Sequence, residues 1–346
     1  MTEGDSPMSS IFAAMAPVPE RTIADATTLD AAIRAADTPF VVRGLVLDWP
    51  LVQAGLKSAQ AARDYLAAKR KDVAFTVSVG EAGSNGRLFY DDAMAMNFRV
   101  GRGKLPDIFG HIASIENQPD APPVYLASID MDGFFTGLAD ENHVDLGDRD
   151  LLKSIWIGTR TRIAAHNDFP QNLACCAVGR RRFTVFPREQ FRNLYLGPID
   201  NTPAGRAVSM VDFHDPDFQQ HPRFGEALAH AQMVELEPGD AIYLPSLWWH
   251  HVEGLAPFNV LVNYWWRDTP RWLGQPQDAL NHAIMSIREL PADERAYWRD
   301  MFDYYVFGDP ELPRAHIPEG AQSVLGPLTA DSAGRLRGFL LRQLSK

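Results

Sequence analysis

The residues of this chain whose types and spacing indicate chemistry most directly are His166 and Asp168, together with the later adjacent pair His250 and His251. Two imidazoles and one carboxylate can hold a divalent iron on one face and leave the other positions open for a cosubstrate and oxygen. The spacing of His166 and Asp168 suits a β-strand, in which alternate side chains point the same way. The pattern therefore predicts a metal site; its structural alternative is a hydrogen-bonded His–Asp pair at a strand end.

Two features around the later pair strengthen the metal interpretation. Only one of two adjacent histidines can face inward from a strand, so the other is expected in a supporting or packing role. Trp248 and Trp249 directly precede the pair, and we expect them to form an apolar wall that limits water at the metal. Residues 237–240, Glu-Pro-Gly-Asp, predict a tight turn between two strands upstream of this segment.

Short strands must position these residues. They are expected at residues 124–128, 154–158, 173–178, 182–186, 233–236, 241–244 and 259–265, and are separated by Gly, Pro and Asp. This pattern is typical of an antiparallel barrel or a double-sheet jelly roll. The fold class predicted is therefore mainly β, with a metal core over residues 122–268.

Other elements flank the β core. Residues 1–20 read as a flexible tail, and residues 21–121 add α/β elements, with helices near 28–33 and 58–70 and strands near 39–44 and 73–79. The character changes near Pro270, and helices are expected at 278–289, 293–307 and 329–344. The predicted domains are thus 1–20, 21–268 and 269–346. The apolar stripe of the last helix predicts that it either covers its own barrel or pairs with another chain.

Composition bounds the class of protein. The chain has 346 residues, a formal net charge of −11 and two cysteines, Cys175 and Cys176. This charge disfavours nucleic acid and anionic membranes as partners, and favours a basic or neutral peptide. Adjacent cysteines in a strand point to opposite faces, so no disulfide between them is expected. With no apolar run of about 20 residues and no signal-peptide layout, we expect a cytoplasmic protein.

Several phrases together resemble a known family. They are residues 166–172 (HNDFPQN), 179–191 (GRRRFTVFPREQF), 238–245 (PGDAIYLP), 248–251 (WWHH) and 262–265 (VNYW). In order and spacing they are similar to the JmjC/cupin-like 2-oxoglutarate-dependent oxygenases, and among these to the factor-inhibiting-HIF type of asparaginyl hydroxylase. The resemblance covers roughly a third of the chain. It implies a double-stranded β-helix (jelly-roll/cupin) core with Fe(II) and 2-oxoglutarate as cofactors.

The resemblance also assigns residues. It implies that the iron ligands are His166, Asp168 and His250, with no catalytic residue beyond them. It implies that the cosubstrate and the iron pocket are lined by Arg181, Asn172, Asn263, Tyr125 and Trp265. Turn or sheet hydrogen bonding is the alternative for the two asparagines and Tyr125, and core packing for Trp265.

Two positions depart from the family's pattern. The family usually has a lysine where this chain has Arg181, and an arginine can also pair with a carboxylate, though with a different geometry. The alternative is that Arg180, Arg181 and Arg182 form a solvated basic patch, but strand alternation also permits Arg181 inward and its neighbours outward. Ile163 replaces a threonine of the asparaginyl hydroxylase and removes a hydroxyl contact.

The function expected from the resemblance is hydroxylation of a protein or peptide side chain, with 2-oxoglutarate decarboxylated to succinate and CO2. A metal-dependent cupin enzyme with other chemistry or a small-molecule substrate, and a non-catalytic cupin binding module, are the alternatives. In the similar enzymes C-terminal helices form a homodimer, so a homodimer through residues 269–346 is the expected assembly.

Overall fold

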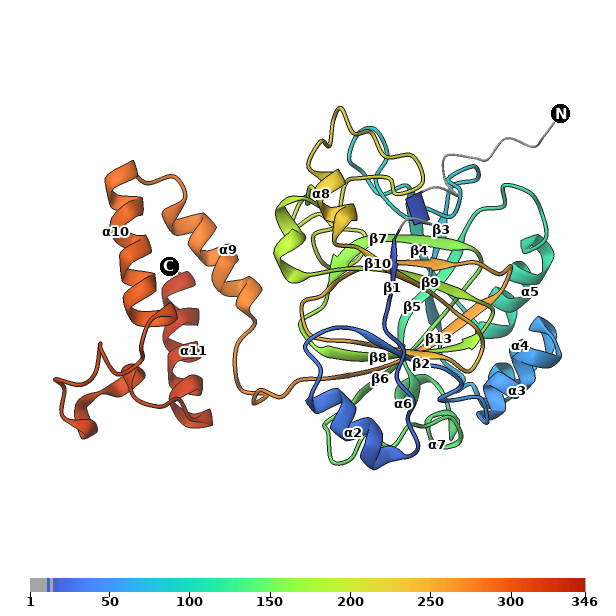
Figure 1. Cartoon of the computed structure of the whole chain (residues 1–346), viewed down its shortest axis with the longest axis horizontal. Coiled ribbons are helices and arrows are strands. Elements are labelled where there is room, and N and C mark those ends of the chain that lie inside the picture. The colour runs from blue at the N-terminus through green and yellow to red at the C-terminus, as the bar shows by residue number, and fades with distance from the viewer. Residues whose placement is uncertain (1–10, 13–14, 346) are drawn as a thin grey trace. The chain divides into compact units, whose positions relative to one another are not determined.

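Two facing β-sheets form the centre of the first of two units into which the chain divides, as seen in the computed structural model, which describes residues 11–12 and 15–345 (Figure 1). The first unit extends to Arg267, and the second begins at Asp268.

Thirteen strands of the described residues make up the two sheets. The five-stranded sheet has the order β1 (Ala16–Pro17), β10 (Gln232–Leu236), β9 (Arg181–Phe186), β12 (Trp249–Gly254), β7 (Thr161–Asn167). The eight-stranded sheet has the order β2 (Phe40–Val42), β11 (Ala241–Leu244), β8 (Gln171–Val178), β13 (Asn259–Trp266), β6 (Leu152–Gly158), β5 (Val124–Asp130), β3 (Phe75–Gly80), β4 (Phe98–Gly103). Neighbouring strands are antiparallel except β1 and β10. The predicted jelly-roll class is therefore confirmed.

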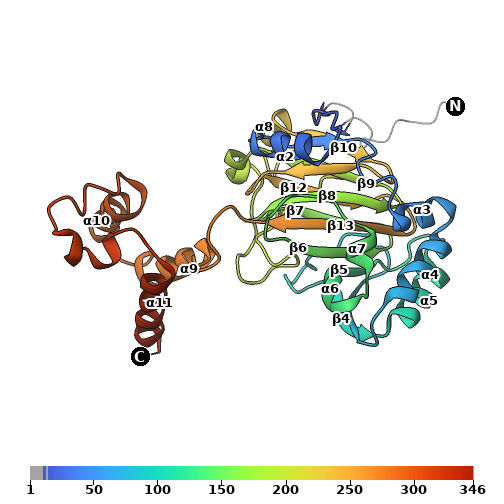
Figure 2. The same cartoon turned by 90° about the horizontal axis from the view of Figure 1, so that it is seen from below.

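Apolar clusters lie on both sides of the sheets. One fills the space between them and includes Phe183 and Val185 of β9 with Leu244 of β11. A larger one lies between the outer face of the eight-stranded sheet and the helices α3 (Pro50–Lys57), α4 (Ala59–Lys69) and α5 (Leu105–Ile115), which Figure 2 shows along one side of the barrel. The other helices among the described residues of this unit include α2 (Ala26–Arg34), α6 (Met131–Phe134), α7 (Leu138–Glu141), η1 (Arg188–Arg192) and α8 (Phe224–Ala229).

The turn predicted at residues 237–240 joins β10 to β11. Gly239 has a φ of 102°, a left-handed conformation that favours glycine. The backbone N–H of Glu237 donates to the Asp240 carboxylate at 3.0 Å, which closes the turn. The turn therefore fixes where β11 begins.

The flexible tail predicted for residues 1–20 is wrong over its last residues. Residues 1–10, 13 and 14 lie outside the described part of the chain, but β1 pairs with β10 and Val18 is buried between the sheets. Burial of Val18 and the backbone pairing of β1 attach this segment to the barrel. Composition alone did not show this, because small residues and prolines dominate the segment.

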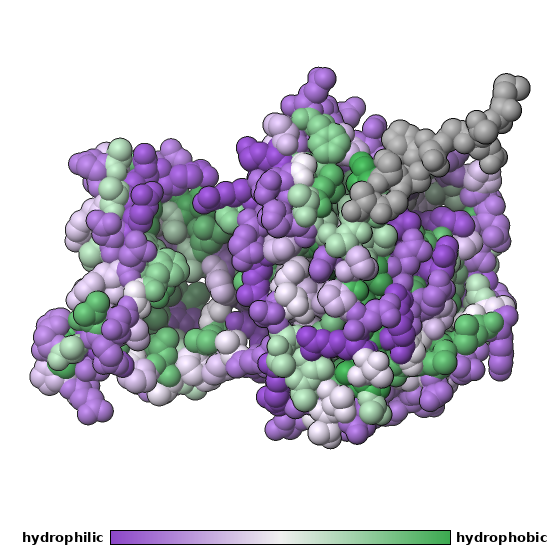
Figure 3. All heavy atoms as spheres, in the orientation of Figure 1, coloured by the Kyte–Doolittle hydropathy of each residue, from purple (hydrophilic) through white to green (hydrophobic). Residues whose placement is uncertain are grey.

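The second unit contains helices whose side chains are largely exposed. Its elements are α9 (Pro276–Ile287), α10 (Ala292–Phe302), the π-helical turn η2 (Asp303–Phe307), η3 (Glu319–Ala321), η4 (Ser323–Leu325) and α11 (Ala330–Leu344). Pro313 is its only buried residue among those described. Figure 3 shows apolar side chains on the visible surface of this unit. None of the helices described anywhere in the chain combines the length and apolar character needed to cross a bilayer.

Candidate metal centre

His166, Asp168 and His250 meet at one end of the five-stranded sheet. His166 lies near the end of β7, and His250 lies opposite it in register near the start of β12. Their two rings are 4.4 Å apart between centroids, and Nε2 of His250 is 3.5 Å from Oδ2 of Asp168. One ligand atom from each residue lies within 4.8 Å of the other two. The structure thus brings together two imidazoles and one carboxylate from distant segments.

Two loops position Asp168, which lies one residue beyond β7 rather than within it. The sequence spacing had suggested that both His166 and Asp168 belong to a strand. Instead, the N–H of Leu247 donates to the Asp168 carbonyl at 2.8 Å, and Ser246 Oγ donates to the Phe169 carbonyl at 2.5 Å. Leu247 has a φ of 67°, so the turn before β12 is sharp. These bonds hold Asp168 beside His250.

Both candidate histidines are oriented by their own backbone. Nδ1 of His166 lies 2.9 Å from the Ala164 carbonyl, and Nδ1 of His250 lies 3.0 Å from the Trp248 carbonyl. A carbonyl only accepts, so each Nδ1 carries a proton, and Nε2 of each ring is the nitrogen left available to a metal. In metal sites, a carbonyl that accepts from the other ring nitrogen orients a histidine ligand in the same way.

The charge states of these groups at neutral pH also suit a cation. Burial, reinforced by the nearby His250, lowers the pKa of His166 to about 4. Burial alone would raise the pKa of Asp168, but its hydrogen bond and charge interaction with His250 outweigh burial and lower the pKa to about 2. Neutral imidazole and ionised carboxylate are the forms that bind a divalent metal.

A cavity of about 340 Å³ opens onto the three residues. It is lined by four of the residues expected at the cosubstrate, Tyr125, Asn172, Asn263 and Trp265. Ile163, the departure from the asparaginyl hydroxylase pattern, also lines it. A cavity of this size is within the range of small-molecule sites.

Trp248 and Trp249 do not form the wall that was predicted from the sequence. Neither lines the cavity. Trp249 packs outside the five-stranded sheet with Phe186 and Phe213, and Trp248 packs between the sheets and donates its indole N–H to the Asp37 carbonyl at 3.0 Å. Strand alternation explains Trp249, because it must point away from the side that His250 faces.

Arg181 lies between the sheets, near Tyr125, and its guanidinium has no carboxylate partner within the described residues. Only 1% of it is exposed, and none of its three guanidinium nitrogens makes a hydrogen bond within the described residues. It does not itself line the cavity. Its strand neighbours point outward, where Arg180 lies 3.5 Å and Arg182 lies 2.7 Å from carboxylate oxygens of Glu235.

The register of β9 and β12 gives the position of Arg181 relative to the metal residues. Val185 of β9 is opposite His250, and Arg181 is four residues earlier on the same strand, about 13 Å along it. Tyr125 lines the cavity and lies near Arg181: burial raises its pKa to about 12, while the charge of Arg181 opposes the increase. A buried, unpaired guanidinium is costly, which indicates a site for an anionic ligand.

Other polar atoms around the cavity also lack partners within the described residues. They are the indole nitrogens of Trp156 and Trp265 and Oδ1 of Asn263. The Nδ2 group of Asn263 donates to Oδ1 of Asn172 at 2.7 Å, so one side of each amide is already used. Together with Arg181, these atoms provide both donors and an acceptor for a polar molecule.

The sequence interpretation missed several cavity residues. Trp156 and Phe183 line the cavity from β6 and β9, and the loop at 203–208 contributes four residues. From the same loop, Arg206 lies 3.8 Å from the centre of the Phe169 ring, and its charge helps to lower the pKa of Asp168. Alternation within the predicted strand 154–158 could have placed Trp156 on one of the two sheet faces. The sequence of the loop contains no local pattern that predicts its position at the cavity.

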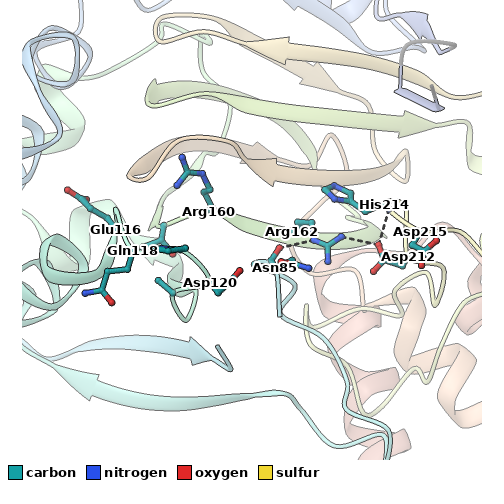
Figure 4. Close-up of a pocket in the computed structure, with 13 residues that line it drawn as sticks. Asn85, Glu116, Gln118, Asp120, Arg160, Arg162, Asp212, His214 and Asp215 are labelled. Atoms are coloured by element: carbon teal, nitrogen blue, oxygen red, sulfur yellow. Dashed lines mark hydrogen bonds and ion pairs between the residues drawn. The ribbon is translucent and has the colours of Figure 1, made fainter. Parts of the chain in front are cut away.

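A larger hollow of about 790 Å³ shares no lining residue with the metal cavity (Figure 4). Several of its charged side chains are paired. Asp212 lies 3.0 Å from Arg162 and 3.2 Å from Arg87, and His214 lies 2.7 Å from Glu253. Size therefore does not identify the reactive site here; the unpaired buried groups do.

Comparisons with known proteins agree with the geometry. A family model described as a cupin-like domain matches residues 26–271. HSPB1-associated protein 1 from Homo sapiens is 29% identical over 152 residues, which are 42% of this chain and 30% of that protein. Lysine-specific demethylase JMJ31 from Arabidopsis thaliana is 31% identical over 115 residues, 33% of this chain and 20% of that protein.

A third relative has a different named role. The tRNA wybutosine-synthesizing protein 5 from Danio rerio is 30% identical over 148 residues, 38% of this chain and 42% of that protein. The matched part thus spans less than half the length of each of these relatives.

Proposed function

The chain belongs to the cupin-like domain family, and on this basis and that of its metal centre we propose that it is an Fe(II)- and 2-oxoglutarate-dependent oxygenase. The observation that carries the proposal is the combination of three converging ligands with a buried, unpaired Arg181 in the same barrel. A metal site that shares its barrel with a buried guanidinium is suited to an anionic cosubstrate.

The chain's own residues fit these two groups. His166, Asp168 and His250 would hold the iron through Nε2, a carboxylate oxygen and Nε2. Arg181 would pair with the carboxylate of 2-oxoglutarate that is remote from the iron, aided by Tyr125. When bound, iron and 2-oxoglutarate supply the oxidising chemistry, with oxygen consumed and succinate and CO2 released. The protein orients these groups, and Trp265 and Trp156 exclude water from them.

We propose a protein or peptide side chain as the substrate. The names of the relatives point in different directions: a lysine-specific demethylase supports a protein substrate, whereas a tRNA-modifying protein does not. The net charge of −11 opposes nucleic acid. Hydroxylation is the reaction proposed; demethylation would follow the same chemistry at a carbon attached to nitrogen.

Turnover of 2-oxoglutarate tests the proposal. Purified protein with ferrous iron should convert 2-oxoglutarate to succinate, and should bind 2-oxoglutarate without oxygen only when iron or manganese is present. Calorimetry under nitrogen measures the binding and mass spectrometry the succinate. Absence of metal-dependent binding would refute the oxygenase.

A metal cupin enzyme with other chemistry is the second candidate. It is favoured by one observation, that Arg181 is not itself among the residues that line the cavity. In that case an Arg181→Met variant should keep its activity and metal content. Loss of 2-oxoglutarate binding in this variant, with metal retained, would exclude it.

We also propose that the second unit forms a homodimer. Its exposed apolar side chains include Phe307 at 74%, Leu341 at 61% and Leu344 at 54%. Apolar surface of this kind on helices without a buried core is expected to be covered in solution. Light scattering should give a dimer mass that Leu341→Glu with Leu344→Glu reduces to a monomer. A monomeric wild type would instead favour packing of these helices on their own barrel.

A further inference from the structure

The eight-stranded sheet ends at β4, whose outer edge carries no strand among the described residues. Figure 2 shows β4 at the margin of the barrel unit. The strand is six residues long and contains neither proline nor a register shift. A side chain built at Gly101 would meet nothing within 4 Å, and Val100 is 63% exposed. An edge of this length and regularity can pair with another extended segment.

The free backbone groups of this edge can be identified. The N–H of Glu81 donates to the Asn97 carbonyl at 3.2 Å, so these opposite residues form a hydrogen-bonded pair. Antiparallel ladders alternate such pairs, which leaves Phe98, Val100 and Arg102 with N–H and C=O directed to the open side. The N–H of Gly80 agrees, because it donates to Pro123 on the side of β3 away from β4.

The charge of this edge is opposite to that of the whole chain. Arg99 and Arg102 are exposed, and neither makes an ion pair within the described residues; Arg102 has only a 3.4 Å contact to the Ala74 carbonyl. Lys104 follows the strand and is paired with Asp72 at 2.7 Å. An acidic extended segment would therefore be attracted. A second copy of β4 would bring arginines of both strands together, which disfavours self-pairing.

The edge also leads to the metal cavity. Phe98 of β4, Ser78 of β3 and Ala127 of β5 all line that cavity. Ser78 lies opposite both Val100 and Tyr125 in register, so these three side chains share one face of the sheet. This face continues through Trp156 of β6, another cavity residue, toward the metal. A strand added beside β4 would extend the same surface.

We propose that the free edge of β4 is the docking site for an extended, acidic segment of the polypeptide substrate, an inference that rests on the proposed function. A strand beside β4 would be five strand spacings from β13, which is at most about 24 Å. About seven extended residues cover that distance. The docked segment would thus lie about seven residues from the part of the substrate at β13, whose Asn263 and Trp265 line the metal cavity, so that docking and oxidation involve separate parts of one substrate.

Binding of defined peptides tests the docking site without any chemistry. The probe is a capped, fluorescein-labelled octapeptide of alternating Glu and Val, titrated with the full-length protein at about 0.15 M salt, which screens charges beyond about 8 Å. We expect saturable binding below 1 mM. The same peptide with Lys in place of Glu, and the same peptide fully N-methylated, should each bind at least tenfold more weakly.

Two matched variants test the edge itself. Val100→Pro removes an outward N–H at an edge position, where proline is tolerated, and should weaken binding at least tenfold. Val100→Thr keeps the N–H and should bind within twofold of wild type. Thermal melting checks the fold of both variants. If Val100→Pro does not fold, Arg99→Glu with Arg102→Glu serves instead and should reverse the preference between the Glu and Lys peptides.

The outcomes separate this inference from the proposed function. Equal binding of the N-methylated peptide, equal binding by Val100→Pro, or no binding by wild type at 1 mM would each overturn edge pairing. Wild-type protein that consumes 2-oxoglutarate but fails these tests would refute the docking site alone. Protein that binds the peptide through β4 but neither binds nor consumes 2-oxoglutarate would refute the oxygenase alone.

Discussion

In strands β9 and β12 of the five-stranded sheet, two neighbouring residues of the same type face opposite sides of the sheet. His250 of β12 and Arg181 of β9 face the space between the sheets, and His251 and Arg182 face outward. All four belong to residue types that can bind ligands. The sequence distance between the members of each pair is a single residue, so the difference between them arises entirely from what they face.

The outer face pairs its charged groups with one another, although neither ring nitrogen of His251 makes a hydrogen bond within the described residues; its Nε2 lies 3.6 Å from Oε1 of Glu253. His251 stacks on Phe213 with ring centroids 4.5 Å apart, and Glu253 is approached by His214 at 2.7 Å and by Arg182 at 3.4 Å. On the inner face, the nitrogens of Arg181 find no partner. The difference teaches that a buried charged group indicates a ligand when it is unpaired, and stability when it is paired.

The largest expected effect separates the two histidines. His250→Ala should reduce iron content and 2-oxoglutarate turnover by at least about 100-fold, because loss of a ligand should exceed the effect of losing a supporting residue. His251→Ala should retain iron but lower the free energy of unfolding by about 2 kcal/mol through loss of packing. Plasma emission spectrometry and urea unfolding measure these quantities. Equal iron loss in both variants would erase the distinction between the faces.

Substitution of Arg181 should weaken ligand binding, whereas substitution of Arg182 should lower stability. Arg181→Met should weaken 2-oxoglutarate binding by about 2–5 kcal/mol, as removal of one member of a buried charge pair does. It should leave the free energy of unfolding unchanged or raise it, because an unpaired buried charge is removed. Arg182→Met should lower stability and leave binding intact. Calorimetry measures the 2-oxoglutarate affinity of both variants, and urea unfolding measures their stability. A destabilised Arg181→Met would show that Arg181 is structural.

The carboxylate of Glu253 tests the outer face by pH. Burial would raise its pKa, but contacts with His214 and His251 outweigh burial and hold the pKa well below the ordinary value of 4.5. Its stabilising contribution is therefore complete above pH 4.5 and is lost as the pH falls toward the folded-state value. Glu253→Gln should cost about 1.5–3 kcal/mol at pH 7, and less as the pH falls below 4.5. Urea unfolding across this range measures the change.

Glu235 is the matched control for Glu253. It also pairs with Arg182, at 2.7 Å, but its side chain is 34% exposed. Glu235→Gln should therefore cost less than about 1 kcal/mol, with little change between pH 7 and 4. If the two variants behaved alike, burial would not explain the role of Glu253.

Strand alternation explains which parts of the site could be predicted. It allowed Arg181 to face inward with Arg180 and Arg182 outward, as the structure shows. It also requires that only one histidine of the adjacent pair face the metal cavity. Applied consistently, it would have placed Trp249 outside, because Trp249 and His250 are neighbours on one strand. The predicted wall is therefore wrong for Trp249, which points to the face opposite His250.

The remaining parts depend on contacts between distant segments. Asp168 is held beyond β7 by the Leu247 N–H, which donates to its carbonyl, and by the Ser246 hydroxyl, which donates to the carbonyl of Phe169; the cavity is lined partly by the loop 203–208. Val18 joins the barrel interior through the pairing of β1 with β10. None of these arrangements has a local pattern in the sequence, because each depends on which strands become neighbours.

The smallest expected effect extends the comparison to tyrosines of the eight-stranded sheet. Tyr125 lines the cavity, whereas Tyr264 of β13 faces away from it and donates its hydroxyl to the Asn142 carbonyl at 2.8 Å. Tyr125→Phe should weaken 2-oxoglutarate binding by about 0.5–1.5 kcal/mol, the value of one hydrogen bond, without loss of stability. Tyr264→Phe should lower the free energy of unfolding by a similar amount and leave binding unchanged. Because the two changes remove the same atom, an effect of Tyr264→Phe on binding would mean that inner and outer faces are coupled through the sheet.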